Sequence, residues 1–160
     1  MSPVIDGWPT CPEHGPRWRL RRNAPCADVA IERDGRVLLQ RRGREPEIGK
    51  WEWPGGYQDL GESPAMTVLR EAREELDIAV RLTGVLGVYL DPWWGEVVQV
   101  TTFVGETDDE PRPATDEVIE WGWFAADRLP PVGEIAFGYP ARLADWATGR
   151  RGPLLPGLGG

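Results

Sequence analysis

The sequence predicts an α+β fold in which two helices accompany a set of strands in one compact unit. Three observations lead to this prediction. The chain has 160 residues, which is one domain's worth of sequence. Segments with strand character precede and follow a stretch of helical periodicity, and a second helical stretch lies near the C-terminal end. Hydrophobic residues make up 41% and charged residues 28%, a balance typical of globular proteins and too apolar for a disordered chain.

A β-hairpin is expected at the start of the domain. Strands over 28–32 and 36–40 flank Asp34-Gly35, a dipeptide suited to a tight turn. Residues 53–56, Trp-Pro-Gly-Gly, are expected to form a short strand that runs into a loop. Further strands are expected over 80–90, 97–104 and 118–124. Trp51 and Trp53 are interpreted as core residues.

The first helix has a recognisable start and end. Ser63 suits the N-cap and Pro64 the first helical position. One apolar helical face follows, made by Ala65, Leu69, Ala72 and Leu76. The helix is expected to end near Leu76-Asp77. A closing helix is expected over 140–147, with Gly149 just beyond its end.

Composition excludes several classes of function. The 18 Lys and Arg against 26 Asp and Glu give a net charge of −8, which disfavours binding to duplex nucleic acid. A phosphate substrate stays compatible with this charge if a cation bridges the two negative partners. No apolar run approaches the roughly 20 residues of a membrane span, and no signal peptide is evident. Two cysteines make no disulfide framework, so a cytoplasmic location is expected.

Three glutamates gather on the first helix. Glu71, Glu74 and Glu75 are related as i, i+3 and i+4, so their carboxylates share a face and repel one another. Arg70 can offset part of this repulsion, and a divalent cation would offset more of it. A solvated face of Glu and Arg would give the same helical pattern, so both interpretations stay open at this point.

The segment before the helix favours the metal interpretation. Gly56, Glu62, Arg70-Glu71 and Glu74-Glu75 form the pattern G-x5-E-x7-R-E-x-x-E-E. In this pattern, and in flanking residues such as Trp53-Pro54-Gly55-Gly56 and Trp123-Phe124, the chain resembles the Nudix hydrolase family over about residues 27–147. It departs from the family at Asp77, where the family has glycine, a position suited to a left-handed residue.

The resemblance implies a Nudix fold, a three-layer α/β/α sandwich with a central mixed sheet. It also implies Mg²⁺ or Mn²⁺ as cofactor, with Glu74 and Glu75 as direct ligands. Glu71 would be a further ligand or would orient and deprotonate the attacking water, and the Gly55 carbonyl would reach a metal. Arg70 would hold the catalytic glutamates by bidentate pairing, and Glu62 would pack the loop onto the site.

The activity implied is hydrolysis of the pyrophosphate bond in a nucleoside diphosphate linked to another moiety, releasing a nucleoside monophosphate. An ADP-ribose-like compound is the first expectation for the substrate. A nucleoside triphosphate pyrophosphohydrolase and a non-catalytic, nucleotide-sensing domain are the alternatives. The nucleobase, the leaving group and the oligomeric state, including a homodimer, are left open.

Other site residues rest on weaker patterns. Glu117 is favoured as a late-loop carboxylate. The other candidates for that role are Glu110, Asp116 and Glu120. Substrate contacts are expected from Arg41, Arg42, Gly56 and Trp93. For Trp93, packing in the core or in a dimer is the alternative to stacking on a base.

Three segments are expected: an N-terminal arm over 1–26, the Nudix domain over 27–148 and a flexible tail over 149–160. Cys11, His14 and Cys26 resemble a degenerate zinc ribbon in the arm. A structural zinc site takes four ligands, so zinc binding by these three residues is left open.

Overall fold

The structure is a computed structural model that describes residues 25–93 and 96–154, with only the backbone described at 92, 93 and 96. Cys11 and His14, whose zinc binding the sequence leaves open, lie outside these ranges, and Cys26 is the first residue of the first strand. The strands are β1 (Cys26–Arg33), β2 (Arg36–Arg42), β3 (Trp51–Glu52), β4 (Gly55–Tyr57), β5 (Arg81–Trp93), β6 (Glu96–Glu106) and β7 (Val118–Ala125). The helices are α1 (Pro64–Leu76), α2 (Tyr139–Ala147) and two 3-10 turns, η1 (Ala126–Arg128) and η2 (Val132–Glu134).

The strands form one mixed sheet in the order β3-β2-β1-β6-β5, with β4 also paired to β1 and β7 to β2. The β1–β6 pair is parallel and the other named pairs are antiparallel. The registered β1–β2 pairs, Glu32 with Val37 and Arg33 with Arg36, lie at the turn. Beyond the turn β1 pairs with β4 and β6, and β2 pairs with β3 and β7.

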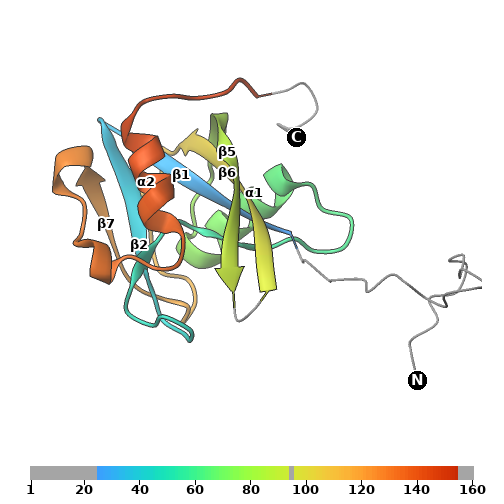
Figure 1. Ribbon diagram of the computed structural model, residues 1–160, viewed down its shortest axis with the longest axis horizontal. Helices are drawn as coiled ribbons and strands as arrows, with labels where there is room; N and C mark the ends of the chain where they lie inside the picture. Colours follow the sequence, from blue (N-terminus) through green and yellow to red (C-terminus); the bar gives the residue numbers. More distant parts are fainter. Residues whose placement is uncertain (1–24, 94–95, 155–160) are drawn as a thin grey trace, which may run out of the picture.

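The two helices cover opposite faces of the sheet, which gives the three layers that the resemblance implied (Figure 1). The apolar face of α1 packs on Val29, Ile31 and Phe103. Leu143 and Trp146 of α2 pack with Ala30 and other residues of the second core. Because successive strand residues point to opposite faces, β1 is apolar on both sides and contributes to both cores.

Helix α1 begins and ends as predicted. The Ser63 hydroxyl accepts a hydrogen bond from the Met66 N–H at 3.2 Å, and Pro64 is the first helical residue. At the other end Asp77 has φ 54° and ψ 38°, the left-handed conformation expected where the family has glycine. Its N–H caps the carbonyls of Ala72 and Arg73.

The predicted strand over 53–56 is wrong in its placement. The segment divides into β3 and β4 around Trp53-Pro54, because Pro54 has no N–H for a ladder and its carbonyl instead accepts the Val29 N–H at 3.0 Å. The two long strands β5 and β6 also extend past their predicted ends, because they pair with each other as far as Trp93 and Glu96.

A tail is expected over 149–160, and one of its residues, Gly152, is hydrogen-bonded to the sheet. Gly152 exchanges two backbone hydrogen bonds with Val85 of β5, at 3.0 and 2.8 Å. No helix in the described ranges is long and apolar enough to cross a membrane.

Candidate active site

The glutamate at the centre of the site, Glu71, lies against the backbone of β4. A Cβ atom built on Gly56 would stand 2.3 Å from Glu71 Oε1, so the carboxylate occupies space that only glycine leaves. Burial raises the pKa of Glu71, the neighbouring Arg70 opposes that rise, and the charges of Glu74 and Glu117 add to it. Glu71 is therefore a partly desolvated carboxylate at the meeting point of helix and sheet.

Arg70 ties the loop before the helix to the catalytic face of α1. Its guanidinium donates to both carboxylate oxygens of Glu62, at 2.7 and 3.0 Å. The same group donates to Glu71 at 2.9 Å, to Glu74 at 3.0 Å and to the Tyr57 carbonyl at 3.1 Å. The bidentate partner is thus Glu62, whereas the resemblance implied that Arg70 would pair in this way with the catalytic glutamates.

Glu62 holds the loop in place, as the resemblance implied. Its carboxylate also accepts the Asp59 N–H and the Thr67 hydroxyl, each at 3.0 Å. The hydrogen bonds from Arg70, followed by those from Asp59 and Thr67, hold the pKa of Glu62 well below its usual range. Arg70 therefore has an ionised anchor on the loop while it contacts Glu71 and Glu74 on the helix.

The three glutamates of α1 have different environments although their spacing puts them on one face. Glu75 is buried and accepts the Gly55 N–H at 3.1 Å. Burial, followed by the negative charge of Glu52, raises the pKa of Glu75 well above its usual range. Glu74 has 55% of its side chain exposed. The alternative of a solvated glutamate face is therefore ruled out for Glu71 and Glu75, and Glu74 is the exposed member of the three.

The donor set fits a divalent cation, although no three His, Cys, Asp or Glu side chains of the described residues form a ready-made metal cage. Mg²⁺ usually keeps several waters and binds one or two carboxylates together with substrate phosphates, so an open set of oxygens suits it. Arg70 is shared among the three carboxylates of Glu62, Glu71 and Glu74, and the buried Glu75 accepts its hydrogen bond from the Gly55 N–H. Added positive charge at this surface would offset the remaining repulsion.

A cavity of about 340 Å³ opens beside these residues. Gly55, Gly56 and Tyr57 of β4 form one wall, and Arg42 and Arg44 lie on the loop side. The cavity also reaches Asp28 of β1, which stands opposite Gly55 in the sheet register. No residue of α1 is among those that line the cavity, and the helix reaches its wall through Gly56 and Gly55, which contact Glu71 and Glu75. The cavity is within the size range usual for small-molecule sites.

Of the two arginines expected to contact substrate, Arg42 lines the cavity. Its Nη1 lies 2.8 and 2.7 Å from the two oxygens of Glu52, and its Nε donates to the Pro46 carbonyl at 2.8 Å. Burial raises the pKa of Glu52 to about 7, although Arg42 acts to lower it. Arg42 is thus held rigidly at the cavity by a buried carboxylate.

The neighbouring Arg41 is not among the residues that line this cavity. It lies 3.5 Å from Glu120 and 3.2 Å from Glu134, and its guanidinium stacks over the Trp51 ring. Adjacent strand residues point to opposite faces, which explains why the two arginines separate. Trp51 and Trp53 are buried, as predicted. Trp93 ends β5, and its side chain lies outside what the structure describes.

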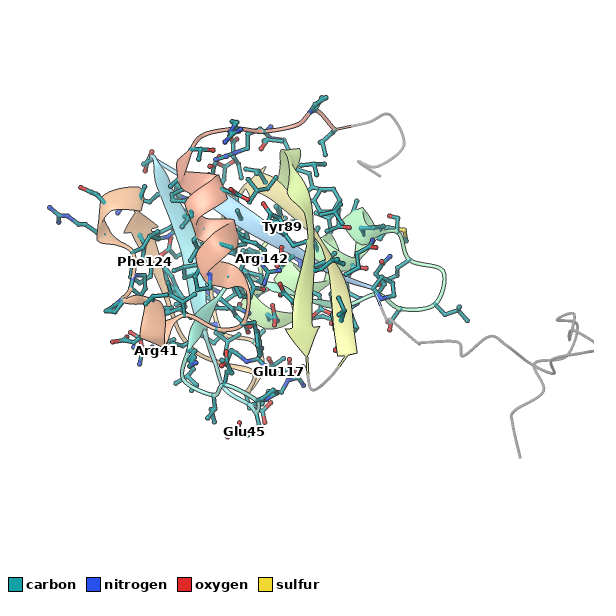
Figure 2. All side chains as sticks on the ribbon, in the orientation of Figure 1. Arg41, Glu45, Tyr89, Glu117, Phe124 and Arg142 are labelled. Atoms are coloured by element: carbon teal, nitrogen blue, oxygen red, sulfur yellow. The ribbon has the colours of Figure 1, made fainter. Side chains whose placement is uncertain are left out.

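Glu117 is the late carboxylate whose charge reaches the helix. It raises the pKa of Glu71, and its own side chain forms an ion pair with Arg44 at the cavity. Figure 2 shows Glu117 near Glu45, at the end of the molecule where the loop after β2 lies. The other candidates are placed elsewhere or exposed: Glu110 pairs with Arg33, Glu120 pairs with Arg41, and Asp116 is exposed.

Comparison with known proteins agrees with this geometry. A family model described as the NUDIX domain matches residues 21–145, which is most of the chain. The chain belongs to the Nudix hydrolase family. It is accordingly a Nudix pyrophosphohydrolase, and the family's substrates are nucleotide diphosphates.

This Nudix hydrolase is similar to proteins with different names. It is 29% identical to the ADP-ribose pyrophosphatase of Methanocaldococcus jannaschii, over 81% of this chain and 76% of that one. It is 33% identical to the NAD-capped RNA hydrolase NudC of Erwinia tasmaniensis over 71% of this chain, which spans less than half of that relative. A crystal structure of a MutT NUDIX hydrolase from Burkholderia pseudomallei has a TM-score of 0.69 and 35% identity, covering 76% of this chain and 96% of that one.

Sequence reasoning missed several residues of this Nudix hydrolase that line the cavity. Glu52, Asp28 and Arg142 are all nearly inaccessible to solvent and all charged. A charged residue within an apolar strand was the available signal: Glu52 stands between two core tryptophans, and Asp28 begins an apolar run. Arg142 gave no comparable signal, because its partner Asp28 is 114 residues away in the sequence.

Proposed function

We propose that this Nudix hydrolase cleaves the phosphoanhydride bond of a nucleoside diphosphate linked to a second moiety, with ADP-ribose-like compounds as the first candidates. The observation that carries the proposal is the position of Glu71, a partly desolvated carboxylate packed on Gly56, which itself lines the cavity. The similarity to a named ADP-ribose pyrophosphatase supports the choice of first candidate.

The residues that would hold Mg²⁺ or Mn²⁺ are Glu71, Glu74, Glu75 and the Gly55 carbonyl. When bound, the cation would polarise the phosphoryl oxygens and lower the pKa of a bound water. Glu71, whose pKa is raised by burial, is the group proposed to accept the proton of the attacking water. Arg70 keeps Glu71 and Glu74 in place through its anchor on Glu62.

Substrate contacts are proposed for Arg42 and Gly56 at the cavity, and Glu117 is proposed to complete the acidic set next to Glu71. Arg41 is left out of this proposal because it contacts Glu120 and Glu134 instead of lining the cavity. In an acidic protein, a cation between these carboxylates and the diphosphate is what allows two negative partners to meet.

The test is a panel of nucleotide pyrophosphates incubated with Mg²⁺ or Mn²⁺, with products read by mass. The panel contains ADP-ribose, NAD, a dinucleoside polyphosphate and the nucleoside triphosphates. The expected result is a nucleoside monophosphate that forms only when metal is present. Release of pyrophosphate from triphosphates would favour the triphosphate alternative, and ligand binding without any product would favour a sensing domain.

Glu75→Gln is the matched variant, because it keeps the shape of the side chain and removes the buried charge. Turnover is expected to fall by about 100-fold or more, since the metal site loses a ligand. Glu120→Gln, at an exposed ion pair with Arg41, is the control and should leave turnover unchanged. Unchanged turnover in Glu75→Gln would show that the assigned metal site is wrong.

A further inference from the structure

The far end of the cavity is built from charged residues that the catalytic chemistry does not use. Arg142 of α2 donates to Asp28 of β1 at 2.9 Å and to Asp91 of β5 at 2.8 Å. The side chains of Arg142, Asp28 and Asp91 are 2%, 3% and 14% exposed. All three line the cavity, so one arginine between two carboxylates forms its inner end.

The aromatic rings beside this cluster hold the arginine in one position. Its guanidinium lies 3.8 Å from the centre of the Tyr139 ring and 5.9 Å from that of Tyr89. Figure 2 shows Arg142 and Tyr89 side by side between α2 and β5. The Nε atom of Arg142 has no acceptor among the described residues. A residue that lines the cavity thus carries a buried donor with no acceptor.

Each cation of this cavity already has an anionic partner. Arg42 is paired with Glu52, Arg44 with Glu117, and Arg142 with two aspartates. At the inner end the two aspartates outnumber the single arginine. A phosphate or carboxylate placed there would meet a buried negative excess with little water to screen it, which disfavours binding.

We propose that the inner end of the cavity is a subsite for an uncharged, hydrogen-bonding part of the substrate, and that Asp91 makes it reject a further anionic group. The proposal rests on the function proposed above and specifies which substrates that site accepts. Two parts of an ADP-ribose-like molecule share the required chemistry, the adenosine end and the distal ribose. Either could present a donor to the aspartates and an acceptor to Arg142.

Asp91 is the residue that makes the net charge of the Arg142, Asp28 and Asp91 cluster negative. Asp28 alone would neutralise Arg142, and Asp91 adds the second carboxylate. A Cβ atom built on Gly138 would stand 2.1 Å from Asp91 Oδ1, so the glycine before α2 makes room for this carboxylate. Asp91→Asn keeps the size of the side chain and makes the cluster neutral.

The experiment compares kcat/KM for ADP-ribose with that for two of its phosphomonoesters. One carries the extra phosphate on the 2′ position of adenosine, and the other carries it on the 1″ position of the distal ribose. For the wild-type chain we expect one phosphomonoester to be at least about tenfold poorer, mainly through KM, and this phosphomonoester identifies the end that enters the subsite. Asp91→Asn should reduce that ratio by about threefold or more while the value for ADP-ribose changes less.

Asp145→Asn is the matched control. Asp145 lies on α2, as Arg142 does, and accepts a hydrogen bond from the Tyr89 hydroxyl, but it does not line the cavity. This variant should leave the ratio unchanged. Asp91→Ala removes the same charge with a smaller side chain and is the second variant if Asp91→Asn folds poorly.

Two failures can be told apart. If the wild-type chain cleaves none of the nucleotides, the proposed function fails, and the subsite is then tested by calorimetric Kd values for the same three compounds with Ca²⁺. If both phosphomonoesters bind and react within about twofold of ADP-ribose, or if neither Asp91 variant changes the ratio, the subsite proposal is overturned.

Discussion

The contact between Gly56 and Glu71 makes a sharp prediction for a single residue. In Gly56→Ala the new methyl would stand 2.3 Å from Glu71 Oε1, and the carboxylate must move because it is the flexible partner. We expect kcat to fall by about 10- to 100-fold, since small displacements of a catalytic group cost that much. The urea unfolding midpoint should change little. Gly133→Ala is the control, because its Cβ meets nothing within 4 Å. A normal kcat in Gly56→Ala would show that the position of Glu71 does not matter for catalysis.

The fork of Arg70 makes a second prediction at this scale. Lysine keeps the charge but cannot contact Glu62 with two nitrogens while also reaching Glu71 and Glu74. We expect Arg70→Lys to lower kcat by about tenfold or more and to change the free energy of unfolding by no more than about 1 kcal/mol, because the group is partly exposed. Arg73→Lys, next to the exposed Asp77, should match the wild type in both measurements. Equal kcat values for the two variants would contradict the positioning role of Arg70.

At the scale of elements, the residue that ends α1 is Asp77, where the family has glycine, and replacing it tests the effect of this difference on stability. Asp77 is left-handed at φ 54°, a conformation that costs glycine nothing and aspartate less than most residues. We expect Asp77→Gly to raise the free energy of unfolding by about 0.5–1 kcal/mol and Asp77→Ala to lower it by a similar amount. Urea denaturation measures both, and kcat should stay unchanged. If Asp77→Gly were less stable than both the wild type and Asp77→Ala, the argument from left-handed backbone strain would be wrong.

The elements differ in how well their sequence predicts them. Helix α1 carries its own start and end signals, so Ser63, Pro64 and Asp77 predict it locally. The Asp34-Gly35 turn does the same for the hairpin. Strands β3 and β4 are too short to carry a period, and their limits depend on pairing with β2 and β1. Pairing between distant segments has no local signal, which is why the strand expected over 53–56 was misplaced.

The same reasoning separates the predictable and unpredictable parts of the site at the scale of the whole molecule. The motif spacing identified Glu71, Glu74 and Glu75 as one group, because a helix face converts spacing into position. It could not show that Glu75 is buried under Gly55, because that depends on where β4 lies. The Arg142–Asp28 pair joins residues 114 positions apart and arises only when α2 packs on the sheet.

Buried carboxylates from separate elements make the stability of the whole metal-free molecule depend on pH. Burial raises the pKa of Glu52 to about 7, and the pKa of Glu75 also lies well above its usual range. Between the ordinary pKa of about 4.5 and about 7, the folded chain binds protons that the unfolded chain has released. The free energy of unfolding should therefore fall as pH rises through this window.

Metal should counteract this loss, because Mg²⁺ binds the ionised carboxylates of the folded chain. We expect Mg²⁺ to raise Tm more at pH 8 than at pH 5, compared with matched samples in EDTA. Glu52→Gln should flatten the metal-free profile between pH 5 and 7, whereas the exposed control Glu120→Gln should follow the wild type. Since burial raises the pKa of Glu52 and Glu75, a metal-free Tm that rises steadily from pH 5 to 7 would mean that these carboxylates are ionised and compensated in the folded chain. Mg²⁺ would then relieve no repulsion among these carboxylates, and it should not raise Tm more at pH 8 than at pH 5.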